Sequence, residues 1–377
     1  MVEEFQNAVS GGISTDWKIY SLGDIVDFQG GSQPPLETFI SSYKEGYIRL
    51  LQIRDYKTDK YETFIPRSLA KKFCDENDIM IGRYGPPLFQ ILRGRMGAYN
   101  VALMKAVPSS EIDGDYLYHF LKQDSLFQFV ESLSKRTAGQ SGIDMKELKN
   151  YPCPLPPTKA EQIAIATALN DADALITQLE KLIAKKRAIK QGAMQELLKP
   201  KEGWEVKKLG EVAESRKGQL ITEKTAVPGN TPVIGGGMSI SYYNDKANRK
   251  ENTITVSASG ANAGFVSFHD YPIFASDCTT IEECPEFDIR FLYFTLLSKQ
   301  NEICKLQTGG AQPHVYSEQL RNLIISIPEE REEQRNIVRM LTDMDAELEV
   351  LEMKLEKHKM IKQGMMQNLL TGKIRLL

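Results

Sequence analysis

Residues 190–198 read Lys190-Gln191-Gly192-x-Met194-Gln195-x-Leu197-Leu198, and the pattern returns as Lys362-Gln363-Gly364-x-Met366-Gln367-x-Leu369-Leu370, an offset of 172. The same offset relates Glu161-Gln162 to Glu333-Gln334, and Asp171-x-Asp173-Ala174 to Asp343-x-Asp345-Ala346. Matches that keep their order through both halves of a chain indicate an internal duplication, which constrains the fold more than any single motif does. The chain therefore consists of two related copies of one long unit.

The beginning of each copy is less regular in length. Trp17-x-x-x-x-Leu22-Gly23-Asp24 returns as Trp204-x-x-x-x-Leu209-Gly210-Glu211 at an offset of 187, and residues 76–81 match residues 251–256 at an offset of 175. The second copy has therefore lost about 15 residues (187 minus 172) before its closing segment, and that segment has lost none. Solenoids also repeat their sequence, but they need three or more short units, and this chain has two long ones.

Short β-like runs between turn residues fill the first part of each copy. Examples are residues 47–53 and 78–81 in the first copy and residues 254–256 in the second, bounded by Gly, Pro and Asp. Apolar residues at intervals of three and four predict one helix over residues 116–133 and another over residues 291–306. We expect each of these parts to be a mixed α/β domain.

The second part of each copy predicts one long helix. Prolines end the first globular part at Pro156-Pro157, and Thr158-x-x-Glu161 then reads as a capping box. Apolar residues follow at steps of three and four, the a/d pattern of a coiled coil. They are Ile165, Leu169, Ala172, Ile176, Leu179 and Ile183 in the first copy, and Ile337, Leu341, Met344, Leu348, Leu351 and Leu355 in the second.

The two apolar stripes have equal length and matched spacing, so each is the natural partner of the other. Parallel pairing would force the second domain to return along the helix, whereas antiparallel pairing needs no such detour. We therefore predict an α+β protein in which two repeated mixed α/β domains are joined by two long helices packed as an antiparallel coiled coil. The expected boundaries are residues 1–157, 158–200, 201–328 and 329–377.

Basic residues interrupt both stripes at matching places, at Lys186 and Lys190 in the first and at His358 and Lys362 in the second. Charged residues at core positions cost stability unless their heads reach water or a partner. They indicate either a solvated end of the coil or a docking surface for another subunit.

Composition excludes several classes of protein. The 377 residues are 41% hydrophobic and carry a net charge of −3, which argues against binding nucleic acid by bulk electrostatics but allows local basic surfaces. The acidic start Met1-Val2-Glu3-Glu4 does not fit a signal peptide, and no stretch approaches the ~20 apolar residues of a membrane span. We expect a cytoplasmic protein without a membrane partner.

Motifs for catalysis or metal binding are missing. The five cysteines are scattered, and Cys278 and Cys284 have no further ligand at zinc spacing, so we expect reduced thiols and no metal. Gln33-Pro34-Pro35-Leu36 and Gly85-Pro86-Pro87-Leu88 lack the Asn or Asp before the prolines and the aromatic residue after them with which an adenine methyltransferase holds a flipped base. No phosphate-binding G-x-x-x-x-G-K-[ST] loop occurs. We expect a non-catalytic protein.

Four signatures occur in the same order in both copies. They are the Trp-x-x-x-x-Leu-Gly-(Asp/Glu) opening, the proline-containing exit at Leu155-Pro156-Pro157 and Ile327-Pro328, the Glu-Gln-x-x-Ile helix start at 161 and 333, and the Lys-Gln-Gly closing. With this order the chain, from Trp17 to Leu377, resembles the specificity subunits of type I restriction-modification systems. The second exit continues with Glu329-Glu330 and lacks the double proline, which leaves its helix cap less clear.

The resemblance implies two target-recognition domains that specify a bipartite, asymmetric site on double-stranded DNA, with an unread spacer between its halves. The implied partners are two copies of an adenine-N6 methyltransferase subunit, recruited largely through the helical regions, and motor-nuclease restriction subunits. Methyl-donor chemistry and ATP use would belong to these partners, so no cofactor is expected on this chain.

DNA contacts require Arg, Lys, Asn or Gln on loops or strands that can enter a groove. The first domain has such a cluster between glycines 82, 85, 94 and 97, which permit close backbone approach. An ordinary solvated surface is the alternative. The candidates are Arg83, Tyr84, Gln90, Arg93 and Arg95.

The second domain has uncharged residues, Ser257, Ser259 and Asn262, where the first has arginine, as two domains with different targets should. Neutral drift would look similar. Gln140 and Gln312 lie in glycine-containing loops before the last turn of each domain and are further candidates, with a structural glycine turn as the alternative. Lys217, Gln219, Lys224 and Tyr242-Tyr243-Asn244 are weaker candidates in the second domain.

Two other functions fit parts of the sequence. One is a coiled-coil scaffold whose two domains bind proteins or small ligands; it predicts that Arg83, Arg93 and Arg95 can be replaced without changing DNA affinity. The other is a self-sufficient methyltransferase or nuclease, which the missing motifs disfavour.

Overall fold

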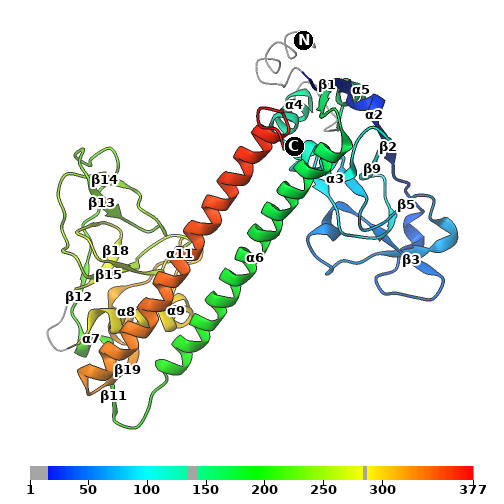
Figure 1. Ribbon diagram of the computed structural model, residues 1–377. Coiled ribbons are helices and arrows are strands. Elements are labelled where there is room, and N and C mark those ends of the chain that lie inside the picture. The colour runs from blue at the N-terminus through cyan, green and yellow to red at the C-terminus, as the bar shows by residue number, and fades with distance from the viewer. Residues whose placement is uncertain (1–15, 135–141, 283–286, 377) are drawn as a thin grey trace. The chain divides into compact units, whose positions relative to one another are not determined.

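A computed structural model describes residues 16–134, 142–282 and 287–376. It divides into two compact units, one formed by residues 1–178 with 355–377 and the other by residues 179–354. Each unit contains one globular part, called here the first head (residues 16–157) and the second head (residues 201–328), and sections of two long helices (Figure 1). No helix within the described ranges has both the length and the hydropathy to cross a membrane.

The first head is built from small sheets and short helices. Its four-stranded antiparallel sheet has the order β2-β9-β6-β7, and a second sheet has the order β4-β3-β8-β5 with β3 and β8 parallel. Strand β1, at the beginning of the head, pairs with β10, at its end, so the two ends of the head lie side by side. The strands are β1 Lys18–Ser21, β2 Val26–Gly30, β3 Tyr47–Leu51, β4 Phe64–Pro66, β5 Phe73–Cys74, β6 Ile79–Gly82, β7 Ile91–Leu92, β8 Gly97–Tyr99, β9 Leu103–Pro108 and β10 Pro152–Leu155. The helices are α2 Leu22–Ile25, α3 Gly114–Leu121, α4 Asp124–Ser134 and α5 Met145–Lys149, with 3-10 turns at Leu36–Thr38, Ile53–Tyr56 and Arg67–Leu69.

The second head repeats this topology. Its main sheet has the order β12-β18-β15-β16, its second sheet the order β14-β13-β17 with β13 and β17 parallel, and β11 pairs with β19. The duplication read from the sequence is thus a duplication of the fold. The strands are β11 Trp204–Lys208, β12 Ser215–Lys217, β13 Thr231–Ile234, β14 Tyr242–Asn244, β15 Thr253–Ser257, β16 Val266–His269, β17 Phe274–Ala275, β18 Cys278–Ile281 and β19 Ile324–Pro328. The helices are α7 Leu209–Val212, α8 Ile289–Ser298, α9 Gln300–Cys304 and α10 Ser317–Arg321.

The two helices predicted within the heads are both interrupted. Helix α3 ends before Lys122 and α4 begins at Asp124, while α8 ends at Ser298 and α9 begins at Gln300. The prediction of one continuous helix in each head was therefore wrong. Residues 122–125 and 298–302 are all polar, so a full turn offers no apolar side chain to the core, and the following helix can pack in another direction.

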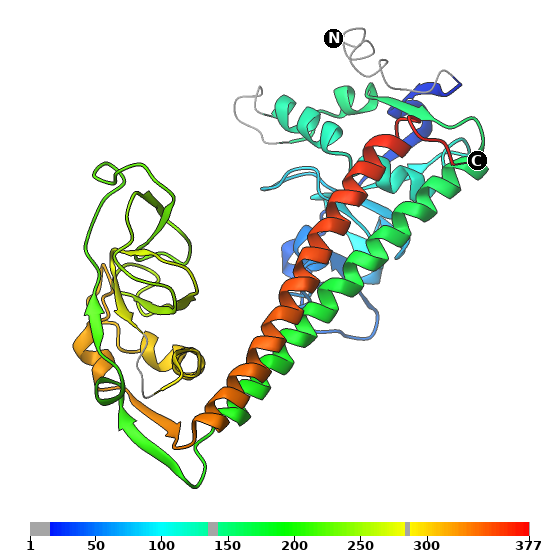
Figure 2. The same ribbon diagram turned by 60° about the vertical axis from the view of Figure 1, so that its left-hand side comes forward.

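The long helices are α6, Lys159–Leu197, and α11, Arg331–Leu369. Within each unit their sections run antiparallel and side by side (Figure 1 and Figure 2). Lys362 of α11 binds Asp173 of α6 in one unit, and Lys190 of α6 binds Asp345 of α11 in the other. The two lysines lie 172 residues apart, as do the two aspartates, so the pairs are reciprocal copies of one contact. The predicted antiparallel pairing is confirmed.

Only part of the predicted apolar stripe lies between the helices. Leu179, Ile183 and Leu348 are buried along the helix pair. The first positions of each stripe belong instead to the core of a head: Ile165 and Leu169 to the first, and Ile337 and Leu341 to the second. The helix ends are therefore parts of the two cores, which fixes each head on its helices.

The repeated Glu-Gln pair fastens each helix start to its head. Gln162 Oε1 accepts the Asp113 N–H at 2.7 Å, and its Nε2 donates to the Glu111 carbonyl at 3.1 Å. Gln334 likewise accepts the Asp288 N–H and donates to the Pro328 carbonyl, both at 3.0 Å. Because Asp113 and Asp288 are the N-caps of α3 and α8, each glutamine joins the start of a long helix to the start of a head helix.

A capping box has two reciprocal hydrogen bonds, and only one of them forms at Thr158. Thr158 Oγ1 accepts the Glu161 N–H at 3.2 Å, as an N-cap should. The return bond, from the Thr158 N–H to the Glu161 carboxylate, is replaced by an ion pair, because Arg375 donates to both carboxylate oxygens. In the second copy, the Glu333 carboxylate accepts from Trp204 Nε1 and Lys201 Nζ, each at 3.3 Å. The glutamates thus tie chain segments distant in sequence to the helix starts.

Candidate nucleic-acid interface

Three segments of the first head meet at one surface. Arg83 directly follows β6, and its guanidinium lies 5.5 Å from the centre of the Tyr84 ring, whose side chain is 44% exposed. A side-chain carbon at Gly30, the last residue of β2, would lie 3.7 Å from Arg83 Nη1, and one at Gly142 would lie 3.8 Å from Tyr84 Cε1. The end of β2, the turn after β6 and the segment at 142 therefore adjoin.

The remaining candidates of this cluster are occupied by local contacts. Arg93 binds Asp115 at 2.6 Å and lies 4.5 Å from the centre of the Tyr118 ring. Arg95 donates to both carboxylate oxygens of Asp59, at 2.7 and 3.1 Å. Hydrogen bonds from Arg49 and from Arg95 lower the pKa of Asp59. These arginines are thus committed to carboxylates.

Arg83 differs from Arg93 and Arg95 because it is not paired with a carboxylate among the described residues. Its guanidinium lies over the Tyr84 ring and close to Gly30. Gln90 donates to the Pro87 carbonyl at 3.0 Å and is half-buried. Of the three arginines in this cluster, Arg83 is therefore the one that can offer its positive charge to a phosphate or a base edge.

The second head brings three matching segments together. Lys217, at the end of β12, lines a cleft of about 230 Å³ with Ala258, which follows β15, and with His314 and Tyr316 of the segment before α10. The His314 and Tyr316 rings are stacked, with centres 6.1 Å apart. These segments correspond in topology to those that meet beside Arg83. The heads therefore present equivalent surfaces with different side chains.

A glycine supports this surface in both heads. A side-chain carbon at Gly31 would come within 2.0 Å of the Asn100 carbonyl oxygen, and one at Gly218 within 2.0 Å of the Ser276 carbonyl oxygen. No larger residue fits at such a distance, so glycine is required for the chain to leave β2 and β12 along these paths.

The predicted residues of the second head fall into two groups. Lys217, Gln219 and Gln312 are exposed, and they lie on the segments that border the cleft. Ser257 is buried, with its hydroxyl donating to the Gly236 carbonyl at 2.9 Å, and Asn262 is half-buried in a turn beyond β15. Gln140 lies outside the described residues.

Sequence reasoning missed two residues of this surface, His314 and Tyr316. Both line the cleft, and Tyr316 is largely exposed. The loop that carries them was predicted from its glycines and Gln312, and aromatic rings beside such a loop are a signal for stacking on bases. Their neighbour Ser259 hydrogen-bonds the Asp277 carboxylate across the same region.

Three of the four predicted partner-binding residues make contacts between the two long helices. Lys190 and Lys362 bind Asp345 and Asp173, and Lys186 Nζ lies 2.7 Å from Glu347 Oε1. His358 is half-buried on α11. The helices expose apolar side chains elsewhere, among them Ile189, Val350 and Met353. A docking role for the four basic residues stays a prediction.

Metal-binding groups do not gather in the part of the chain that the structure describes. No three His, Cys, Asp or Glu side chains there could hold a metal ion together. Cys74, Cys153 and Cys278 are buried free thiols, and burial raises the pKa of Cys74 to about 11 and that of Cys278 to about 12. Cys284 lies outside the described residues.

Comparison with known proteins agrees with this architecture. The family model described as "Type I restriction modification DNA specificity domain" matches residues 14–191 and 201–357, one match for each copy. The type I restriction enzyme MjaVIII specificity subunit of Methanocaldococcus jannaschii is 26% identical over 407 aligned residues, covering 97% of this chain and 94% of that protein.

Two solved structures share the fold. The S subunit of a type I restriction-modification system from M. genitalium has a TM-score of 0.67 at 18% identity, covering 95% of this chain and 96% of that one. A chain from a structure described as the basis of complex assembly and conformational transition of the type I R-M system has a TM-score of 0.58 at 16% identity, covering 96% and 99%. With two family matches that together span most of its length, the chain belongs to the family of type I restriction-modification specificity subunits.

Proposed function

We propose that the chain reads a bipartite, asymmetric site on double-stranded DNA, one half with each head. The observation that carries this proposal is the pair of equivalent surfaces, one with Arg83 and Tyr84 and the other with Lys217, His314 and Tyr316. Arginine, lysine and aromatic side chains are the groups that contact bases and phosphates, and unlike sets at matched positions suit two different half-sites.

We further propose that methylation and cleavage are supplied by partners, namely two adenine-N6 methyltransferase subunits and motor-nuclease restriction subunits. The long helices are the candidate docking region, because they expose apolar side chains such as Ile189 and Met353 to solvent. On this view the chain selects the site and its partners carry out the reaction.

A mobility-shift titration with and without the methyltransferase partner tests the proposal. We expect sequence-specific binding to a duplex that contains both half-sites once the partner is present, and weak or nonspecific binding by the chain alone. The arrangement would be refuted if the complete complex bound duplexes without regard to sequence.

Arginine substitutions test the first head in particular. Losing a base or phosphate contact of Arg83 should cost about 1–3 kcal/mol, which is roughly a 5- to 150-fold loss of affinity in Arg83→Ala. Arg95→Ala is the matched control, because Arg95 is bound to Asp59, and it should change affinity by less than about threefold. If Arg83→Ala left the affinity and specificity for DNA unchanged, the result would favour a coiled-coil scaffold that binds other ligands over a DNA-reading subunit.

A further inference from the structure

The two heads differ on one face of their main sheets. In the first head Met80 on β6 lies opposite Leu92 on β7, and both pack in an apolar cluster with Leu51, Tyr99 and Leu103. The residues 175 positions later, Thr255 and Ser267, lie opposite each other on β15 and β16. The second head therefore has hydroxyl groups where the first has a packed hydrophobic core.

This polar face continues along both strands of the second head. Ser257 and His269 also belong to it, since side chains two residues apart on a strand share a face. The alternate residues Ile254, Val256 and Val266 pack into the main core on the other side. Although they are polar, Thr255, Ser257 and His269 are buried, and Thr255 Oγ1 lies 2.9 Å from His269 Nε2. Burying such groups costs free energy that an apolar pair would avoid.

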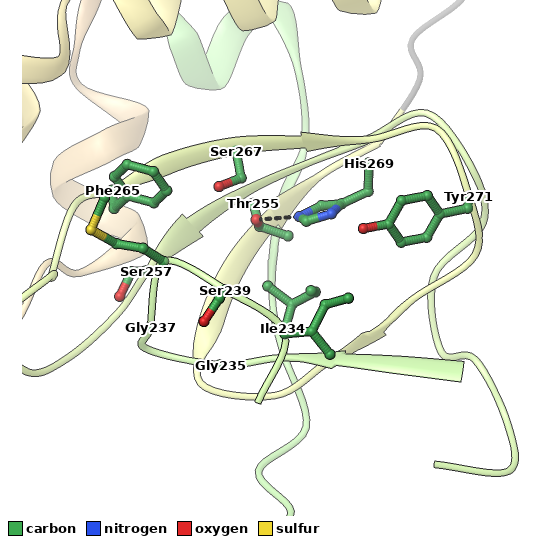
Figure 3. Close-up of a pocket in the computed structure, with 12 residues that line it drawn as sticks. Ile234, Gly235, Gly237, Ser239, Thr255, Ser257, Phe265, Ser267, His269 and Tyr271 are labelled. Atoms are coloured by element: carbon green, nitrogen blue, oxygen red, sulfur yellow. Dashed lines mark hydrogen bonds between the residues drawn. The ribbon is translucent and has the colours of Figure 1, made fainter. Parts of the chain in front are cut away.

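A cavity of about 310 Å³ lies against this face. Figure 3 shows Phe265 and Tyr271 at opposite ends of it, with Thr255, Ser267 and His269 between them. The segment 235–240 forms another wall, and its residues Met238 and Ser239 are exposed at the rim. The cavity is thus lined by hydroxyls and an imidazole between two aromatic rings.

The cavity has no charged group for an anion or a cation. None of the twelve described residues that line it is Asp, Glu, Lys or Arg. Burial lowers the pKa of His269 to about 4, so its imidazole is neutral at pH 7, and burial raises the pKa of Tyr271. The lining therefore suits an uncharged ligand with hydrogen-bonding edges and a flat apolar face.

We propose that this cavity of the second head binds a nucleobase, as a nucleoside or as an unpaired base of DNA. Bases pair flat apolar faces with donor and acceptor edges, and proteins bind them by aromatic contact and hydrogen bonds. The hydroxyls of Thr255 and Ser267 and the neutral His269 can each donate or accept. Binding of a nucleobase is inferred from the cavity alone. Only the possibility that this base belongs to DNA rests on the proposed function.

Fluorescence of 2-aminopurine, which stacking on a ring quenches, provides the test. The full chain is titrated with 2-aminopurine riboside and, separately, with a duplex carrying one unpaired 2-aminopurine; the same duplex with that base paired serves as reference. We expect a saturable 1:1 change in fluorescence with a dissociation constant below about 1 mM in at least one arm: quenching of the riboside, which is unstacked in solution, or a rise for the duplex, whose base leaves its stacked neighbours. Saturation by the riboside indicates a soluble source, and saturation by the unpaired duplex alone indicates DNA.

Variants of the cavity decide where the base binds. Thr255→Met with Ser267→Leu fills the cavity with the residues of the first head and should weaken binding at least tenfold. Ser239→Trp blocks the exposed rim without altering the core, so it decides the question if the double variant fails to fold. Ile324→Ala, at an exposed position of β19 in the same head and outside the lining, should leave binding unchanged.

Two results would overturn the proposal: no saturable fluorescence change with a dissociation constant below about 1 mM in either arm, or a change that Ser239→Trp leaves intact. Failure of the complex to recognise a DNA sequence would defeat the proposed function, yet the riboside arm would still report on the cavity.

Discussion

Exchanging the charges of Lys362 and Asp173 should preserve a helix contact that either single substitution destroys. Lys362 lies on α11 and Asp173 on α6, and the side chain of Lys362 is only 13% exposed. Asp173→Lys would place two ammonium groups against each other in a mostly buried position. Asp173→Lys combined with Lys362→Asp would restore opposite charges at the same two positions.

The size of the effect follows from burial. Removing one partner of a fully buried ion pair costs about 3–5 kcal/mol, and breaking an exposed pair costs below about 1 kcal/mol. Because the Asp173 side chain is 34% exposed, solvent screens part of the interaction, and we expect about 2 kcal/mol for Asp173→Lys. The pair Arg187–Glu352, with side chains 64% and 45% exposed, is the matched control, and Glu352→Lys should cost about 0.5 kcal/mol.

Hydrogen exchange measured by mass spectrometry on residues 355–369 gives the local opening free energy and does not require the whole chain to unfold in one step. A loss of about 2 kcal/mol should speed exchange there roughly 30-fold, and the charge swap should recover at least half of the lost free energy. If the swap were as damaging as Asp173→Lys, or if Glu352→Lys had the same effect, the ion pair would not be what holds this register.

Three further changes give separate tests. Gln334→Leu leaves a backbone N–H and a backbone C=O of the second head without their partners. It should therefore lower the free energy of unfolding, measured by urea titration, by about 2–4 kcal/mol. The control Gln367→Leu, at an exposed position, should change it by less than about 0.5 kcal/mol. Because burial lowers the pKa of His269 to about 4, the unfolded chain binds the proton more tightly, and stability should fall by up to about 3 kcal/mol as the pH drops from 6.5 to 4; His269→Gln should remove this slope. Gly218→Ala should lower stability by about 1–3 kcal/mol and weaken recognition of one half-site only, measured by thermal unfolding and mobility shift.

Much of the fold could be predicted from the sequence because the duplication is long. The reciprocal pairs Lys190–Asp345 and Lys362–Asp173 join residues that the repeat had already singled out, and they confirm the antiparallel arrangement. The partner of each apolar residue could not be predicted in the same way. Ile165 and Leu179 occupy similar positions in the stripe, yet Ile165 packs in the core of the first head. Spacing shows that a residue is buried but not which element covers it.

The candidate interface was predictable in location but not in detail. Arg83, Arg93 and Arg95 are the same residue type in one short region, and the sequence gives no reason to separate them. Their difference comes from Asp115 and Asp59, which lie 22 and 36 residues away along the chain from the arginines that they bind. Folding brings these carboxylates to Arg93 and Arg95 and leaves Arg83 without one among the described residues.

The glutamines at the helix starts have a consequence for how these proteins diversify. Gln162 and Gln334 bind main-chain N–H and C=O groups of the heads, and every amino acid except proline supplies both. A head can therefore exchange most of its side chains without losing its attachment. New target preferences could arise by mutation while the scaffold that presents them stays assembled.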